Sequence, residues 1–236
     1  MEVTAYQSAY MVVSVLALVV WCVLYFLMPN SRRAMISTSL VFAMAGPVAE
    51  YWDGRNYWHP GYVFEFNLGS WRFGIEDYLC AFAYAGIAAG VFESCARRRT
   101  EADSFPPDFR RTVRMVILGF AGLIVMTAAM FIPGIKSIDA HIGTITFVSL
   151  LMIGRRFEVW RLQALLVPAA MLVYTLYLHF VFKLAYPGIV ELMWIPSGKS
   201  GVDILGIPIE ESLWAGAVML LCGPVYRICC ERSPEA

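Results

Sequence analysis

Residues 74–77 of this chain read Gly-Ile-Glu-Asp and residues 208–211 read Pro-Ile-Glu-Glu, and each tetrapeptide opens a long apolar stretch. A Trp-x-Pro segment precedes each of them, at residues 58–60 and 194–196. The tryptophans are 136 positions apart and the acidic pairs 134, which predicts two copies of one unit that differ by a two-residue insertion or deletion. Carboxyl groups at a membrane boundary are costly unless the protein uses them. The repeated acidic pair is therefore the first indication of function.

The composition is that of a membrane protein. Hydrophobic residues make up 59% of the 236 positions and charged residues 15%, with a mean hydropathy of +0.64, unlike an ordinary soluble domain. About 20 apolar residues are enough for a helix to cross a bilayer. Seven stretches approach or exceed that length, although Gly46 and Pro47 interrupt the second: 8–28, 34–51, 75–96, 112–134, 137–154, 162–186 and 205–228. We therefore expect an all-α integral membrane protein with seven transmembrane helices.

The distribution of Lys and Arg predicts the orientation of these helices. If the N-terminus lies outside, thirteen basic residues fall in cytoplasmic segments and five in outer segments. The outer set is Arg55, Arg72, Lys136, Lys183 and Lys199. This excess follows the positive-inside rule for seven spans with the N-terminus out and the C-terminus in. The expected localisation is the cell membrane, which the chain crosses several times.

Several other classes of protein and site are not expected. The formal net charge is zero and no basic stripe with interleaved aromatics occurs, so no nucleic-acid partner is expected. The six cysteines show neither CxxC nor the His/Cys spacing of a zinc site, which argues against a disulfide framework and a metal site. We expect no cofactor. Membrane lipid is an expected partner, and a homo-oligomer remains possible.

The repeat predicts how the chain is organised. Residues 1–98 form the first three-helix unit, residues 99–136 an inner linker plus a connector helix, and residues 137–236 the second three-helix unit. After three helices and one connector helix the chain is back on the side where it began, so the second unit crosses the membrane in the same direction as the first. The two repeats are therefore parallel and related by an axis along the membrane normal. In each unit an outer loop of some twenty residues joins the second and third helices, at 52–74 and 187–204.

Ionisable side chains from five predicted helices gather near the outer boundary, within about two turns at 1.5 Å rise per residue. They are Glu50, Asp53, Glu76, Asp77, Asp139, His141, His179, Glu210 and Glu211. A single acid in the first turn of a helix is ordinarily a response to the helix dipole and the free N–H groups. That explanation is weaker for consecutive acids present twice, because neighbours lie about 100° apart and one of each pair can face inward. For each histidine, an interhelical hydrogen bond is the ordinary alternative to a functional role.

Acids in a dry, aromatic chamber suit one kind of chemistry. Burial and neighbouring carboxylates both disfavour ionisation, and a protonated carboxylic acid is the group needed to protonate an alkene. Aromatic faces then stabilise the resulting carbocation without capturing it as water would. The candidate lining is Trp52, Trp58, Trp71, Tyr78, Trp194 and Trp214, with His141 and His179. An interfacial aromatic belt is the ordinary alternative for many such residues.

These two motifs resemble the duplicated lycopene cyclase domain, an integral-membrane family whose repeat begins a helix with Pro-x-Glu-Glu after a Trp-containing loop. The second copy matches through Pro208, Glu210 and Glu211, whereas the first has Gly74 and Asp77 at the proline and second glutamate positions. The resemblance implies a flavin-independent, redox-neutral isomerisation. An acid protonates the terminal double bond of an acyclic isoprenoid, a six-membered ring closes, and a base removes a proton.

On this resemblance Glu76 and Glu210 carry over as the acid and base, with Asp77 and Glu211 as their supporting neighbours. The first expected substrate is lycopene, in carotenoid biosynthesis. A related small membrane terpene cyclase acting on a prenylated or shorter polyprenyl substrate is an alternative, with Glu50 and one acid of the last helix as its carboxylates. A proton-coupled transporter is a second alternative, since intramembrane acids also serve proton relays.

Overall fold

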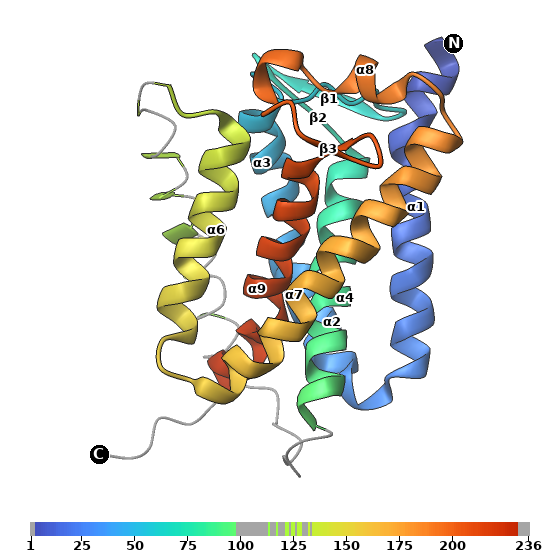
Figure 1. The fold of residues 1–236 in the computed structure, drawn as a ribbon. Helices are drawn as coiled ribbons and strands as arrows, with labels where there is room; N and C mark the ends of the chain where they lie inside the picture. Colours follow the sequence, from blue (N-terminus) through green and yellow to red (C-terminus); the bar gives the residue numbers. More distant parts are fainter. Residues whose placement is uncertain are drawn as a thin grey trace.

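The computed structural model describes residues 3–97 and 135–230, together with scattered positions between 113 and 134 (Figure 1). The chain is mostly helical, and four helices within the described residues are long and apolar enough to cross a membrane. They are α1 (Val3–Leu27), α4 (Ile75–Arg97), α7 (Phe157–Leu178), which continues into the π-helical segment η2 (His179–Leu184), and α9 (Ile209–Cys230). A fifth apolar helix, α6 (Ser137–Ile153), has 17 residues. The predicted connector helix at 112–134 lies largely outside the described residues.

The prediction of seven spanning helices is therefore not confirmed. The second predicted span is broken: after the short η1 (Pro29–Ser31), α2 (Arg32–Ala43) has 12 residues and α3 (Ala45–Asp53) has 9. Pro47 has no N–H to donate and its ring clashes with the carbonyl four residues earlier, which breaks a continuous helix at this point. The last predicted span also begins late, because α9 starts at Ile209 rather than 205.

Two short antiparallel hairpins, which the all-helical expectation missed, fill the ends of the outer loops. Strand β1 (Glu65–Leu68) pairs with β2 (Trp71–Gly74), and β3 (Asp203–Ile204) pairs with β4 (Ile207–Pro208). Both have two-residue turns with positive φ, at Gly69 in the first and at Leu205 and Gly206 in the second, as tight hairpins require. Each hairpin leads directly into a helix that begins with an acidic pair, so the hairpins fix where α4 and α9 start.

Helices α4 and α9 form the centre of the bundle. They pack against each other, α1 and α2 pack on α4, and α6 and α7 pack on α9. The hairpins, α8 (Ile189–Met193) and η3 (Pro196–Gly198) lie together at one end of the bundle with the N-terminus, and the chain leaves at the opposite end (Figure 1). We call the first of these the hairpin end.

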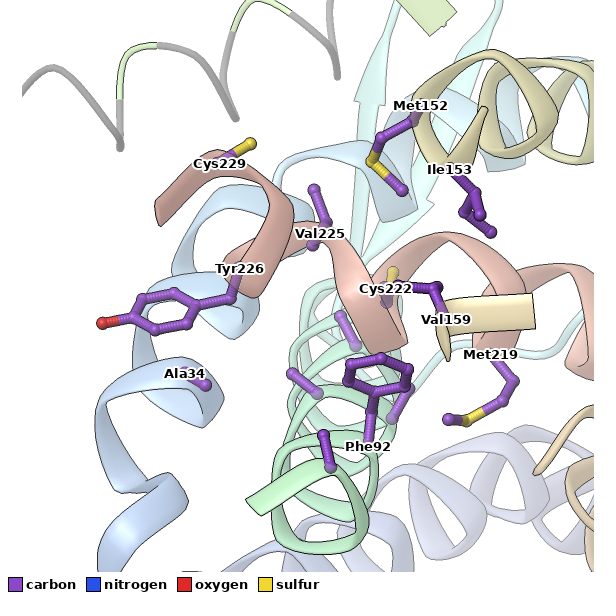
Figure 2. Packing of buried hydrophobic residues seen from close by; sticks show 14 of the residues in the cluster. Ala34, Phe92, Met152, Ile153, Val159, Met219, Cys222, Val225, Tyr226 and Cys229 are labelled. Atoms are coloured by element: carbon purple, nitrogen blue, oxygen red, sulfur yellow. The ribbon is translucent and has the colours of Figure 1, made fainter. Parts of the chain in front are cut away.

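The apolar interior has two clusters. In the cluster far from the hairpins, Phe92 of α4 points toward Cys222 and Met219 of α9 and Val159 of α7 (Figure 2). Alanines at 85, 88 and 89 of α4 are buried in the same cluster, and such small residues let helix backbones approach closely. The second cluster lies at the hairpin end and is rich in Tyr and Trp. The aromatic cluster surrounds the candidate site.

Candidate active site

The two Trp-x-Pro segments contact each other directly. The His59 N–H donates to the Met193 carbonyl at 2.7 Å, and the Ile195 N–H donates to the Tyr57 carbonyl at 2.7 Å. These reciprocal bonds form an isolated antiparallel bridge between Trp58 and Trp194, whose ring centroids are 5.6 Å apart. The bridge covers the hairpin end of the α4–α9 pair with two indole rings.

The first acid of each pair binds the loop that precedes it. Glu76 Oε1 accepts the Val63 N–H at 2.7 Å, and Glu210 Oε1 accepts the Ser200 N–H at 2.5 Å. Both side chains are buried, and the second oxygen of each has no hydrogen-bond partner among the described residues. Glu76 and Glu210 therefore hold the two outer loops against the starts of α4 and α9.

The second acid of each pair lines a cavity. This cavity, which we call the acid cavity, has a volume of about 90 Å³. Its ionisable lining is Glu50, Asp53, Asp77, His141 and Glu211, and its aromatic lining is Tyr10, Tyr57, Trp58, Tyr84, Tyr174, Phe182, Trp194 and Trp214. Neither Glu76 nor Glu210, nor any Lys or Arg of the described residues, belongs to this lining. A positive charge formed inside would face carboxyl groups and π faces.

Glu211 is held by three hydrogen-bond donors. Its Oε1 accepts the Tyr57 hydroxyl at 2.8 Å and the Trp194 indole N–H at 2.9 Å, and its Oε2 lies 3.5 Å from the Tyr174 hydroxyl. Burial and the adjacent Glu211 raise the pKa of the Tyr57 hydroxyl, so this group remains a donor at neutral pH. The indole N–H of Trp194 can only donate. Glu211 is thus held in one orientation by the three hydrogen bonds that it accepts.

Asp77 has a different environment. Its Oδ2 accepts the Gly74 N–H at 2.8 Å, while its Oδ1 is buried and has no hydrogen-bond partner among the described residues. The neighbouring Glu50 accepts the Trp58 indole N–H through both oxygens, at 3.1 and 3.0 Å. Buried polar atoms are rarely left unpaired, and an exception in a cavity is a candidate for contact with a ligand.

A third polar pair joins α3 to α6. His141 Nδ1 lies 2.8 Å from Asp53 Oδ2, with both side chains largely buried. A hydrogen bond at this distance orients the imidazole ring. His141 lies beside Trp214, with ring centroids 6.4 Å apart. The expected interhelical hydrogen bond of this histidine is therefore present, and both members of the pair line the acid cavity.

Four residues expected to bind substrate lie outside the acid cavity. The Arg55 guanidinium stacks over Trp52, and the Trp71 indole N–H donates to the Pro47 carbonyl. Tyr78 lies edge-on to Phe73 of the first hairpin, and His179 Nδ1 lies 2.9 Å from the Leu205 carbonyl in the turn of the second. These side chains support the outer loops. Trp58, Trp194, Trp214 and His141 do line the cavity.

Several lining residues are not predicted from the sequence. The sequence gives Asp53 no role beyond its place among the outer acids, and it gives none to Tyr10, Tyr57, Tyr84, Tyr174 and Phe182. A tyrosine directly before the first Trp-x-Pro segment was a usable signal for Tyr57. Tyr84 and Tyr174 lie within α4 and α7, where nothing in the sequence distinguishes them from ordinary interior aromatics.

One comparison with known proteins finds a match, and it covers the second part of the chain. No curated protein and no solved structure matches the sequence. The family model described as lycopene cyclase matches residues 140–229, a segment that includes His141, Trp194 and the acidic pair of α9. Residues 140–229 thus match the lycopene cyclase family, which confirms the resemblance inferred from the sequence motifs.

Proposed function

We propose that this protein is a membrane-embedded isoprenoid cyclase that closes a ring by protonating an acyclic polyene, with the end group of lycopene as its first substrate. The family match at residues 140–229 supports a cyclase of this kind. The observation that carries the proposal is the acid cavity. There Asp77 and Glu211, one acid from each repeated pair, face a lining that is otherwise aromatic and apolar, apart from Glu50, Asp53 and His141.

We assign the proton donor to Asp77. Its Oδ1, which has no hydrogen-bond partner among the described residues, can present a proton to the terminal double bond. Protonation leaves a tertiary carbocation, and the π electrons of the internal alkene then form the new carbon–carbon bond of a six-membered ring. No electrons enter or leave, so the product is an isomer of the substrate.

We assign the base to Glu211. A proton beside a carbocation is strongly acidic, so a carboxylate that already accepts hydrogen bonds is basic enough to remove it. The bonds from Tyr57 and Trp194 hold Glu211 in place, and such positioning makes proton transfer efficient. Trp58 and Trp214 offer π faces to the cation, and an apolar wall keeps water from capturing it.

This assignment exchanges the roles expected from the sequence. Glu76 and Glu210 bind backbone N–H groups of the outer loops, and we propose that they position the acids that follow them. Glu50, bonded to Trp58, lies with Asp77 in the lining of the acid cavity, and we propose that it contributes to the charge of the site.

We also propose the parallel repeat, the seven spans, the N-out orientation and the cell membrane as location. Two contacts support the repeat. The Trp58–Trp194 bridge is reciprocal, and at the far end of the bundle Arg227 of α9 donates to Glu93 of α4 through Nε and Nη2 at 3.1 and 3.0 Å. Positions 93 and 227 are also 134 apart, so equivalent positions of the two units meet at both ends.

A terpene cyclase for a prenylated or shorter polyprenyl substrate is the second candidate. One observation favours it: at about 90 Å³, the acid cavity is smaller than the roughly 150 Å³ cavity that binds benzene in another protein. A shorter polyprenyl substrate has the same end group as lycopene but less chain behind it, so it needs less rearrangement of the protein to fit. The chemistry and the roles of Asp77 and Glu211 are the same for both substrates.

Expression in cells that accumulate lycopene tests the proposal. We expect the wild type to convert the pigment to a cyclic carotenoid, and Asp77→Asn and Glu211→Gln each to reduce conversion by about 100-fold or more, as loss of a general acid or base does. Glu158→Gln is the control, because this side chain is 72% exposed at the start of α7. Unchanged lycopene with the wild type rejects the carotenoid substrate, and full activity of Asp77→Asn rejects the acid assignment.

A further inference from the structure

A second cavity adjoins the acid cavity and lies between the four helices that are long and apolar enough to cross a membrane. Its volume is about 180 Å³, and its walls come from four helices: Ala17 and Val20 of α1, Ile87 and Ala88 of α4, Val173 of α7 and Val218 of α9. We call it the chain groove. Apart from the tyrosines at its inner end, its lining carries no polar side chain among the described residues. A polar head group placed there would lose its hydrogen bonds to water without gaining partners.

The outer end of the groove opens between α1 and α7. Val20 is 45% exposed and Val173 is 65% exposed, and both lie within helices long and apolar enough to cross a membrane. Near the hairpin end the Tyr177 hydroxyl donates to the Val13 carbonyl at 2.5 Å and joins α7 to α1. Toward the other end the two helices diverge (Figure 1). In a bilayer this opening would face lipid tails rather than water.

The inner end of the groove meets the acid cavity at three aromatic side chains. Tyr84, Tyr174 and Trp214 line both cavities, and their ring centroids are 5.3 to 5.8 Å apart. The Tyr174 hydroxyl also lies 3.5 Å from Glu211 Oε2. The Tyr84–Tyr174–Trp214 cluster therefore lies between the chain groove and the acid cavity as a single layer of side chains.

We propose that the chain groove binds the linear hydrocarbon chain of one isoprenoid molecule, which enters sideways from the bilayer between α1 and α7. Its end group passes the Tyr84–Tyr174–Trp214 cluster into the acid cavity. This inference rests on the proposed cyclase function and adds the binding site of the chain. It also restricts the substrate to molecules whose chain is acyclic and apolar for some length behind the reacting end.

A pair of substitutions on α7 tests the groove. Val173→Trp places a large ring across the opening, whereas Leu172→Trp places the same ring on a neighbouring position that is 61% exposed and outside the groove. Both variants are reconstituted in lipid nanodiscs with lycopene or with a short acyclic diene that has the same end group. Binding is measured by quenching of tryptophan fluorescence, and turnover by product analysis.

We expect Val173→Trp to weaken lycopene binding and turnover by about tenfold or more, equivalent to about 1.4 kcal/mol, and to leave the short diene within about twofold of wild type. Leu172→Trp should match wild type with both substrates. Ala170→Phe, inside the groove, replaces Val173→Trp if the latter does not fold. Equal lycopene binding in all variants, or an equal loss of turnover with both substrates, would overturn the proposal that the chain groove binds the hydrocarbon chain. Because binding is measured apart from turnover, lycopene that binds in the groove but is not cyclised would reject only the cyclase function.

Discussion

At the scale of single residues, the two acids of each pair have different roles. The first acid of each pair accepts a backbone N–H of its loop, and the second lines the acid cavity. The sequence predicted that one member of each pair faces inward, because adjacent residues on a helix lie about 100° apart. It could not say which one, since that depends on where the hairpins place the first turns of α4 and α9.

The Tyr57 hydroxyl provides a direct test of how Glu211 is held. Tyr57→Phe removes the 2.8 Å hydrogen bond to Oε1 and leaves the ring in place. A hydrogen bond to a charged group contributes about 1.5–3 kcal/mol, so we expect kcat to fall by about 10- to 100-fold with little change in KM. Steady-state kinetics in nanodiscs measure both.

Tyr51→Phe is the matched control, because the Tyr51 hydroxyl accepts from the Arg55 guanidinium outside the acid cavity. It should leave both kinetic constants near wild type. A Tyr57→Phe enzyme with unchanged kcat would mean that Glu211 needs no such positioning, and the role of base would then have to be reassigned.

At the scale of elements, close contact between α3 and α4 brings Glu50 and Asp77 into one cavity. A methyl group at Gly46 would lie 2.3 Å from the Asp77 carbonyl oxygen, which is backbone and cannot move aside alone. We expect Gly46→Ala to separate the two helices, to lower stability by about 1–3 kcal/mol, and to reduce activity with it. Thermal unfolding in detergent, monitored by circular dichroism, measures the first effect.

Gly143 offers the comparison, since it also lies in a helix but no atom of the described residues lies within 4 Å of a methyl group added there. Gly143→Ala should be neutral or raise stability by up to about 1 kcal/mol, because alanine is the better helix former. Equal stability of the two variants would show that α3 can move away from α4 without consequence.

The sequence predicted the long helices well and the outer loops poorly. Hydropathy located α1, α4, α7 and α9, because about 20 apolar residues in a row are a strong signal. The break between α2 and α3 was visible as Gly46 and Pro47. The two hairpins were missed because strands of two to four residues are too short to show an alternating pattern, and their pairing depends on the turn geometry.

At the scale of the whole molecule, contacts at both ends lock α4 to α9. The Glu93–Arg227 ion pair is largely buried, at 2% and 12% side-chain exposure. Removing one partner of such a pair leaves a buried charge and costs about 3–5 kcal/mol, whereas replacing both with apolar residues is often neutral. We expect Arg227→Met to lower the unfolding temperature strongly and Glu93→Leu/Arg227→Met to recover most of the loss.

The sequence does not predict the Glu93–Arg227 contact, because the two residues are 134 positions apart and only the repeat relates them. Its test is thermal unfolding of the two variants beside wild type. If the double variant is as unstable as Arg227→Met, the ion pair itself stabilises the fold. The expectation that apolar residues can replace both partners without loss would then be wrong for this protein.

The central claim is that a side-chain proton starts ring closure and that no electrons are exchanged. Purified protein in nanodiscs, incubated with lycopene in D₂O, tests it most directly, with the product analysed by mass spectrometry. The account predicts an isomer of the substrate that carries one solvent-derived deuterium for each ring formed, and none with Asp77→Asn. A cyclic product without deuterium, or one that differs from the substrate by two hydrogens, would contradict it.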